Sequence, residues 1–206
     1  MKHSLLRRGF KKDAETWSIE IREKLGVEAT GACPARCVAD LHGVSVTPIQ
    51  CLSGLAQNFL YDEFPDQQDI DKKMALLLNR NGEFSAVVAI VGGFKMILFN
   101  SDHSPARQES DIMHELAHII CEHPGDCLQL NADIALRQYN AQHEEEAKWL
   151  GATLQVPDQG LFTLARLGLA NAAIADIYGA SLEMVVFRRK TLGIDLRLSR
   201  LKKFIR

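Results

Sequence analysis

Residues 110–125 read SDIMHELAHIICEHPG and contain two histidines, His114 and His118, four positions apart, with Glu115 directly after the first. Residues four apart in a helix lie on the same face, so two imidazoles at this spacing can bind one metal ion. Histidine nitrogens bind zinc at about 2.0 to 2.1 Å, and a glutamate beside them can reach a water on the metal. The stretch therefore predicts a metal site; the alternative is an amphipathic helix that carries two surface histidines.

The sequence around this stretch predicts a helix from about Pro105 to Glu122. Ser104 can cap its start, a proline in the first turn needs no hydrogen-bond donor, and Pro124-Gly125 ends it. We expect the two histidines to face away from a buried apolar stripe, toward a cleft. The apolar stripe comprises Ile112, Leu116, Ile119 and Ile120, and the opposite side carries Asp111, His114, His118 and Cys121.

A second helix, predicted over Glu144–Gln155, can supply a third ligand. Catalytic zinc sites usually have three protein ligands and leave the fourth position to water. Glu144 borders the edge formed by Ala147 and Gly151, whose small size would let two helices approach closely. Glu144 is therefore the predicted third ligand, whereas the two glutamates after it fit better an acidic run favoured by the helix dipole. Weaker candidate ligands are His123, His143 and Cys121, and His103 and His42 are expected in loops or at helix ends.

The remaining pattern predicts an α+β fold that is mainly helical, with a small antiparallel sheet. Strand patterns at 83–91 and 94–100 are joined by Gly92-Gly93, which is typical of a hairpin because both glycines accept positive φ. We divide the chain into a domain of residues 1–160 and a helical C-terminal region of residues 161–206. The other expected elements are a strand at 44–49 and helices at 13–25, 34–41 and 69–78.

Composition places the chain among globular proteins. Its 206 residues are 47% apolar and 24% charged, which is enough to bury a core. The five cysteines form no repeated framework and therefore indicate reduced thiols. We find no signal-peptide pattern and no apolar stretch of the ~18 residues needed to span a bilayer. A soluble, cytoplasmic protein without a membrane partner is expected.

The C-terminal end is basic. Its last twenty residues carry a net charge of +7, whereas the rest of the chain carries −9. Residues 171–193 have the outline of a helix-turn-helix, but the would-be reading helix, Leu182 to Lys190, begins with apolar residues where base contacts need polar ones. Packing is therefore the favoured role, with weak nucleic-acid contact as an alternative. The cations available for such contact are Arg188, Arg189, Lys190, Arg197 and Arg200.

The segments FSAVVAIVGGFKMILFNSDHSPARQESDIMHELAHII and EEEAKWLGATLQVP resemble the ImmA/IrrE family of zinc metallopeptidases. In that family a strand ending in Asn leads to a helix with HExxH, followed about 25 residues later by an ExxA motif. The resemblance implies a zincin-like fold of the gluzincin type, Zn2+ bound by His114, His118 and Glu144, and Glu115 as general base. It also implies that the target is a helix-turn-helix transcriptional repressor of a stress-response, phage or mobile-element system. The stretch AKWLGATLQVP departs from the commoner form, which has Asn after the Ala and Met before the Pro.

Three functions compete at this point. The favoured one is a zinc-dependent endopeptidase that cleaves one transcriptional regulator. A metal-binding regulatory or antitoxin-type protein of the same fold would need the metal but not Glu115. A DNA-binding module would need only the basic C-terminal helices. For the peptidase, Tyr139 and His143 are candidate oxyanion donors between which spacing does not choose, and the strand at 94–100 could pair with an extended peptide.

Overall fold

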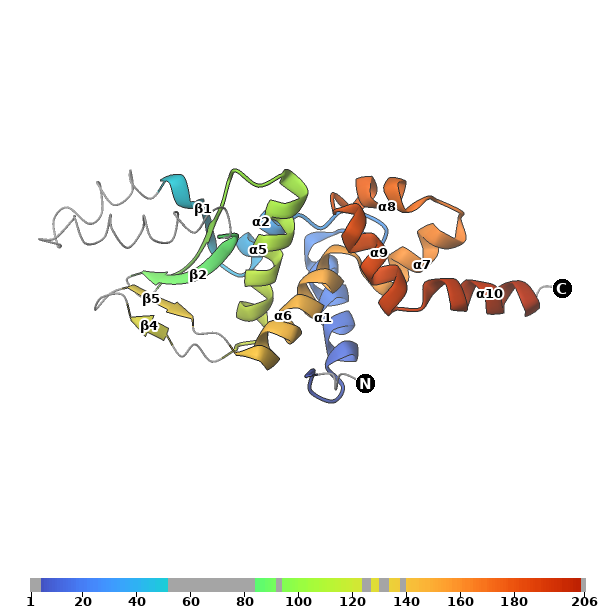
Figure 1. The fold of residues 1–206 in the computed structure, drawn as a ribbon, viewed down its shortest axis with the longest axis horizontal. Coiled ribbons are helices and arrows are strands. Elements are labelled where there is room, and N and C mark those ends of the chain that lie inside the picture. Colours follow the sequence, from blue (N-terminus) through green and yellow to red (C-terminus); the bar gives the residue numbers. More distant parts are fainter. Residues whose placement is uncertain are drawn as a thin grey trace, which may run out of the picture.

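A layer of helices lies at the centre of the molecule, between a small sheet and a group of C-terminal helices (Figure 1). The computed structural model describes residues 5–51, 84–91, 94–123, 127–129, 134–137 and 140–204. The central helices are α1 (Phe10–Leu25), α2 (Ala35–Leu41), α5 (Pro105–Ile120) and α6 (Ala141–Gln155). The C-terminal helices are α7 (Asp158–Arg166), α8 (Asn171–Tyr178), α9 (Leu182–Thr191) and α10 (Ile194–Phe204).

The helices expected from the sequence agree with the structure, except at some ends. α1 begins at Phe10, three residues before the expected start, and α2 and α5 agree with their predicted ranges within two residues. α6 begins at Ala141 because the side chain of Asn140 accepts hydrogen bonds from the amides of residues 142 and 143 and so caps the helix. The helix expected at 69–78 lies outside the described residues.

The sheet has the order β1-β3-β2-β5-β4. Its central pair is the predicted antiparallel hairpin, with Val88 opposite Ile97, although its Gly92-Gly93 turn lies outside the described residues. The expectation of an antiparallel sheet is wrong in one respect, because β1 pairs with β3 in parallel and the sheet is mixed. A parallel pair needs a long connection, which the chain between β1 and β2 provides. The strands are β1 (Ser45–Pro48), followed by the 3₁₀ turn Ile49–Cys51, β2 (Ala86–Val91), β3 (Phe94–Phe99), β4 (Cys127–Gln129) and β5 (Ile134–Arg137).

Helix α5 is buried on a wider face than its sequence predicts. Ile112 and Leu116 are fully buried as expected, but so are Met113 and Ala117, whereas Ile119 and Ile120 of the predicted stripe are only half-buried. The reason is that α5 contacts both β2 and β3 of the sheet and also packs against α6, and Figure 1 shows it between β2 and α6. The predicted histidine face therefore points toward a neighbouring helix.

A second apolar cluster lies within α7 to α10 and the segment that leads into them. Arg188 of α9, which is completely buried, joins this cluster to the central helices: its Nε donates to the carbonyl of Val156 at 2.8 Å and one Nη to Glu15 of α1 at 2.7 Å. The division after residue 160 stays a prediction. The second cluster comprises Val156, Leu161, Leu164, Ala165, Ile174, Ala175, Tyr178, Ala180, Val185 and Ile194.

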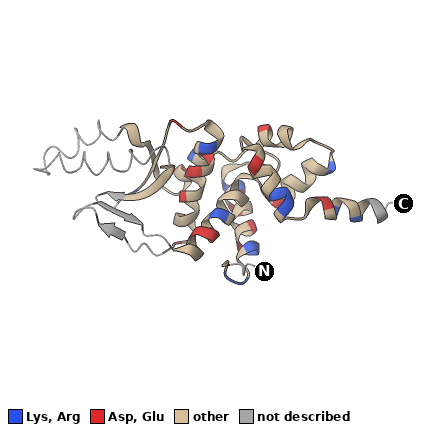
Figure 2. Ribbon diagram, viewed as in Figure 1, with Lys and Arg blue, Asp and Glu red and all other residues tan. Residues whose placement is uncertain are grey.

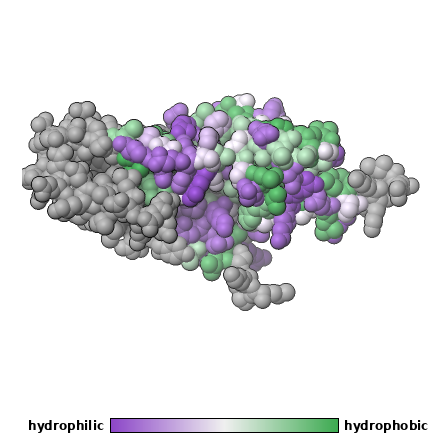
Figure 3. Space-filling model, turned by 45° about the horizontal axis from the view of Figure 1, so that its top comes forward, coloured by the Kyte–Doolittle hydropathy of each residue, from purple (hydrophilic) through white to green (hydrophobic). Residues whose placement is uncertain are grey.

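Apolar side chains also reach the surface of the C-terminal helices, where Figure 3 shows hydrophobic areas between hydrophilic ones. On α9, Leu182 and Val186 are each 46% exposed. The apolar start of the would-be reading helix thus partly faces solvent, and only Val185 and Arg188 of this helix are buried. Within the described parts of the chain, no helix is both long and apolar enough to span a membrane.

Candidate metal centre

Three predicted ligand side chains converge between α5 and α6. The Nε2 atoms of His114 and His118 are 3.2 Å apart, and carboxylate oxygens of Glu144 lie 3.1 Å from the first nitrogen and 3.5 Å from the second. The histidines come from successive turns of α5, and the carboxylate comes from the first turn of α6. The structure brings these residues together, while their roles as ligands stay a prediction.

These separations fit a tetrahedral cation. Ligand atoms at about 2.0 to 2.1 Å from a tetrahedral zinc ion are about 3.3 to 3.4 Å from one another, and the three observed separations range from 3.1 to 3.5 Å. The His118 side chain is 1% exposed, but those of His114 and Glu144 are 30% and 24% exposed. The cluster therefore has a buried inner side and an outer side that a substrate could reach.

Gly151 lets the two helices approach closely enough for this convergence. A Cβ atom at this position would lie 3.2 Å from the carbonyl oxygen of Met113 and 3.3 Å from the Cα of His114. Ala147, one turn earlier, is completely buried. The expectation that small residues of α6 face the histidine helix is confirmed, and Glu144 lies on the same edge two turns before Gly151.

Glu115 lies beside the cluster and is held from the sheet. Glu115 is 7% exposed, and one of its carboxylate oxygens accepts a hydrogen bond from the amide of Val88 in β2 at 3.1 Å. A Glu115 oxygen and one nitrogen of each histidine all lie within 4.8 Å of one another. This group of His114, Glu115 and His118 differs from the predicted ligand set. We favour Glu144 as the third ligand because its oxygens have metal-like separations and because β2 already orients Glu115.

The other side of His118 is also occupied by polar groups. Its Nδ1 lies 2.9 Å from Nδ1 of His123, and Nε2 of His123 lies 3.1 Å from Glu146. Glu146 is 4% exposed, so the expectation that it belongs to a solvated acidic run is wrong, whereas Glu145 is exposed as that expectation requires. Burial raises the pKa of Glu146, but hydrogen bonds from His123, from the Arg7 amide and from Gln142 outweigh burial and leave this pKa lowered.

The weaker candidate ligands lie at other positions around the cluster. His143 stacks on His123, with ring centroids 4.4 Å apart and 8° between the planes. Cys121 follows the last turn of α5, and burial raises the pKa of its thiol to about 12, so it is protonated at neutral pH. His103 precedes α5 and pairs with Asp111 at 2.9 Å, and His42 ends α2, as expected for both. Tyr139 lies outside the described residues.

The predicted peptide-pairing strand does not have a free edge. β3 lies between β1 and β2 and pairs with both, so the expectation that residues 94–100 pair with a substrate is wrong. A short strand pattern cannot tell an edge strand from an interior one, which caused this error. In the described strands, β5 pairs with Ala89–Val91 of β2 and leaves Ala86–Val88 beyond the pairing, next to Glu115.

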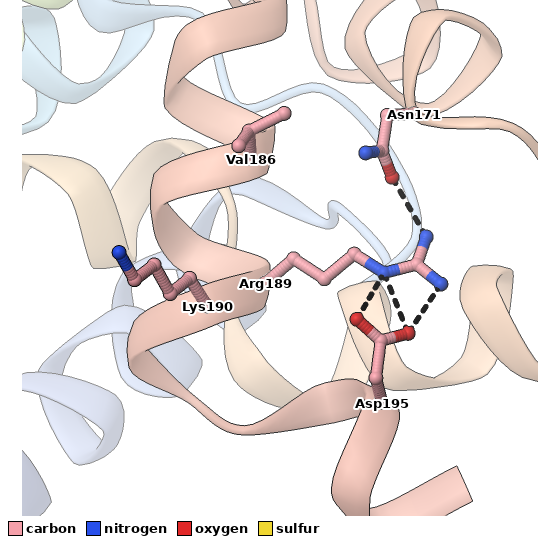
Figure 4. A pocket seen from close by; sticks show the side chains of 5 residues that line it. All are labelled: Asn171, Val186, Arg189, Lys190 and Asp195. Carbon is pink, nitrogen blue, oxygen red and sulfur yellow. Dashed lines mark hydrogen bonds and ion pairs between the residues drawn. The ribbon is translucent and has the colours of Figure 1, made fainter.

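Most basic side chains that the sequence offered for nucleic-acid contact have carboxylate partners within the chain. Arg188 pairs with Glu15, Arg197 with Asp158, and Arg189 with Asp195. Figure 4 shows the Arg189 guanidinium between the Asp195 carboxylate and the Asn171 side chain, in an open pocket of about 490 Å³. Basic and acidic positions are accordingly interspersed along these helices (Figure 2).

A group of two histidines and a glutamate on one helix, with a second carboxylate from the next helix, is the kind of site found in metallopeptidases. Sequence comparison agrees with this class. The model of the peptidase M78 family, described as the IrrE N-terminal-like domain, matches residues 70–190. Because this match covers more than half of the chain, the protein belongs to the ImmA/IrrE family, and family membership indicates a metallopeptidase. A search among curated proteins finds no match.

Proposed function

We propose that this protein is a zinc-dependent endopeptidase of the gluzincin type, with His114, His118 and Glu144 as metal ligands and Glu115 as general base. The observation that carries the proposal is the convergence of the two histidine Nε2 atoms, 3.2 Å apart, with the two oxygens of the Glu144 carboxylate, one 3.1 Å from His114 and the other 3.5 Å from His118. Three acceptor-type side chains at these separations suit a shared cation, because a metal binds their lone pairs from one point. Membership of a metallopeptidase family supports the same conclusion.

Glu115 suits proton transfer for geometric reasons. Zinc, when bound, lowers the pKa of a water molecule and polarises a carbonyl group. Glu115 lies near both histidines but is held by the Val88 amide through one oxygen, so its carboxylate has a fixed direction. In the proposed reaction it accepts the proton of the attacking water and passes it to the nitrogen of the leaving amine. This role requires its ionised form at the start of each cycle.

The substrate is proposed to be an extended segment of a helix-turn-helix transcriptional regulator, cleaved in the cytoplasm. Among the described strands, β5 pairs with β2 only at Ala89–Val91, and Val88 contacts Glu115, so an extended peptide beside Ala86–Val88 would lie across the proposed general base. Outside its last twenty residues the chain carries −9, which would attract a basic DNA-binding partner at low salt. The class of regulator follows from the family resemblance.

The experiment compares wild type with Glu115→Gln, using a co-encoded helix-turn-helix repressor and casein as substrates. We expect wild type to contain zinc and to cleave the repressor at one site while casein stays intact. Glu115→Gln should keep the zinc but lose ~10²-fold or more in turnover, since general bases contribute about this much. Equal turnover in both proteins would overturn the peptidase mechanism and favour a non-cleaving regulator. Rapid casein degradation with an intact repressor would overturn the substrate assignment.

A further inference from the structure

A chain of hydrogen-bonding groups continues from His118 away from the proposed ligand cluster. His118 Nδ1 contacts His123 Nδ1 at 2.9 Å, and His123 Nε2 contacts a Glu146 oxygen at 3.1 Å. The His123 and Glu146 side chains are 4% and 5% exposed. Three polar side chains buried in a row need complementary donors and acceptors, so the position of each proton is constrained by its neighbours.

The direction of this chain follows from Glu146. Its other oxygen accepts hydrogen bonds from the Arg7 amide at 3.2 Å and from Gln142 at 3.3 Å, and two donors on one oxygen favour the ionised carboxylate. His123 Nε2 must then carry the hydrogen that Glu146 accepts. A neutral imidazole has one donor and one acceptor, so His123 Nδ1 is an acceptor and His118 Nδ1 carries a hydrogen. This leaves a lone pair on His118 Nε2, which faces His114 and Glu144.

We infer that His123 and Glu146 are positioning residues that hold His118 in the Nδ1–H tautomer, with the Nε2 lone pair directed at the proposed zinc site. Outer hydrogen-bond partners of this kind fix the ring orientation and tautomer of a metal-binding histidine. The inference rests on the proposed function for the identity of the metal, but the tautomer is a property of the chain without metal. The two ideas can therefore fail separately.

The fold holds His123 in place from three directions. Glu122 has a φ of 51°, which turns the chain back after α5 and lets the His123 amide donate to the His118 carbonyl at 3.2 Å. The His143 ring of α6 stacks on His123. The N-terminal segment, through the Arg7 amide, holds Glu146. Because separate segments fix one imidazole that is not itself in the ligand cluster, its position is set by the fold and not by the metal.

The test measures the His118 tautomer by long-range ¹H–¹⁵N NMR of metal-free, histidine-labelled protein. We expect the Nδ1–H form in wild type and a mixture of forms in His123→Ala. Glu146→Gln, which keeps the shape but removes the carboxylate, should also raise the Nε2–H population of His118. An Nε2–H form in wild type, or an unchanged tautomer in both variants, would overturn the inference.

Zinc affinity, measured by chelator competition, gives a second result. His123→Ala should weaken binding by ~10- to 100-fold, the usual effect of losing such a partner, whereas His123→Gln should lose much less because its amide can accept from His118 and donate to Glu146. Equal losses in both variants would mean that His123 is itself a ligand and would overturn the positioning role. The matched control is His103→Ala, which removes another histidine that pairs with a carboxylate, Asp111, and should change neither measurement. Absence of peptide cleavage by zinc-loaded wild type with the expected tautomer would contradict only the proposed function.

Discussion

Helices α5 and α9 each carry polar side chains whose spacing indicates a binding function, but the partners of these side chains in the folded protein differ. On α5, His114 and His118 meet a carboxylate that, like them, can bind a cation. On α9, Arg188 and Arg189 each meet a carboxylate of opposite charge. The first arrangement suits binding of an ion, whereas in the second each arginine already pairs with a carboxylate of the chain. The spacing of side chains on one helix indicates a possible function. Whether these side chains can bind a ligand depends on the residues that neighbouring elements place against them.

The largest expected effect is the loss of bound zinc when one of the proposed ligands is removed. His118→Ala and Glu144→Ala each remove one of the three proposed ligands, so bound zinc should fall from about one ion per chain to nearly none. Metal analysis of the purified variants measures this. Glu145→Ala is the matched control, since Glu145 is adjacent in sequence but exposed, and it should keep its zinc. Full zinc occupancy in Glu144→Ala would remove Glu144 from the ligand set.

Loss of the ion pair of Arg188 on α9 should lower the stability of the protein without removing bound metal. Arg188→Ala removes a buried guanidinium that pairs with Glu15 and donates to the Val156 carbonyl, and it leaves Glu15 with the hydrogen bond from the Asp158 amide. We expect the free energy of unfolding to fall by about 3 kcal/mol, the low end for breaking a buried pair, because the Glu15 side chain is 26% exposed. Denaturant titration measures this. Arg200→Ala, at an exposed position of α10, should stay within about 0.5 kcal/mol of wild type. If the free energy of unfolding of Arg188→Ala also stayed within about 0.5 kcal/mol of wild type, the Arg188–Glu15 pair would not stabilise the packing of α9 against α1.

A smaller effect is expected where α5 and α6 touch. In Gly151→Ala the added Cβ lies 3.2 to 3.3 Å from backbone atoms of α5, so the helices must move apart slightly. We expect a loss of about 1 to 3 kcal/mol in stability, as for other overpacked sites, together with weaker zinc binding because Glu144 moves with α6. Gly31→Ala is the control, since its Cβ would have ordinary contacts at 3.5 Å or more. Unchanged zinc affinity in Gly151→Ala would show that the ligand geometry tolerates this shift.

The sequence was sufficient for the parts of the site that depend on local periodicity. The helix that carries His114 and His118 and the small residues near Glu144 both follow from a period of 3.6 residues, and the β2–β3 hairpin follows from alternation around two glycines. The sheet order did not follow, since a short strand pattern such as that of β1 carries no information about its partner. β4 and β5 were missed because strands of three and four residues are too short to show a clear alternation of apolar and polar residues.

The roles of Glu146 and His123 could not be predicted from the sequence because their contacts come from distant segments. Glu146 is one of three adjacent glutamates at a helix start, and one of its hydrogen bonds comes from the amide of Arg7, near the other end of the chain. His123 lies five residues after His118, which is visible in the sequence, but its orientation depends on a left-handed turn at Glu122.

The smallest expected effect concerns nucleic acid. Within the described part of the tail, Lys190 and Arg200 are exposed and form no ion pair with a described carboxylate, in contrast to Arg188, Arg189 and Arg197. Each phosphate that a protein neutralises adds ~0.9 to the slope of log affinity against log salt for duplex DNA. Replacing both free cations by alanine should therefore reduce that slope by no more than about 2, equally for any duplex sequence, and should leave repressor cleavage unchanged. Fluorescence anisotropy at several salt concentrations measures the slope. If the double variant instead lost tight binding to one particular sequence, the tail would contact bases, and the view that α9 is a packing helix would have to be given up.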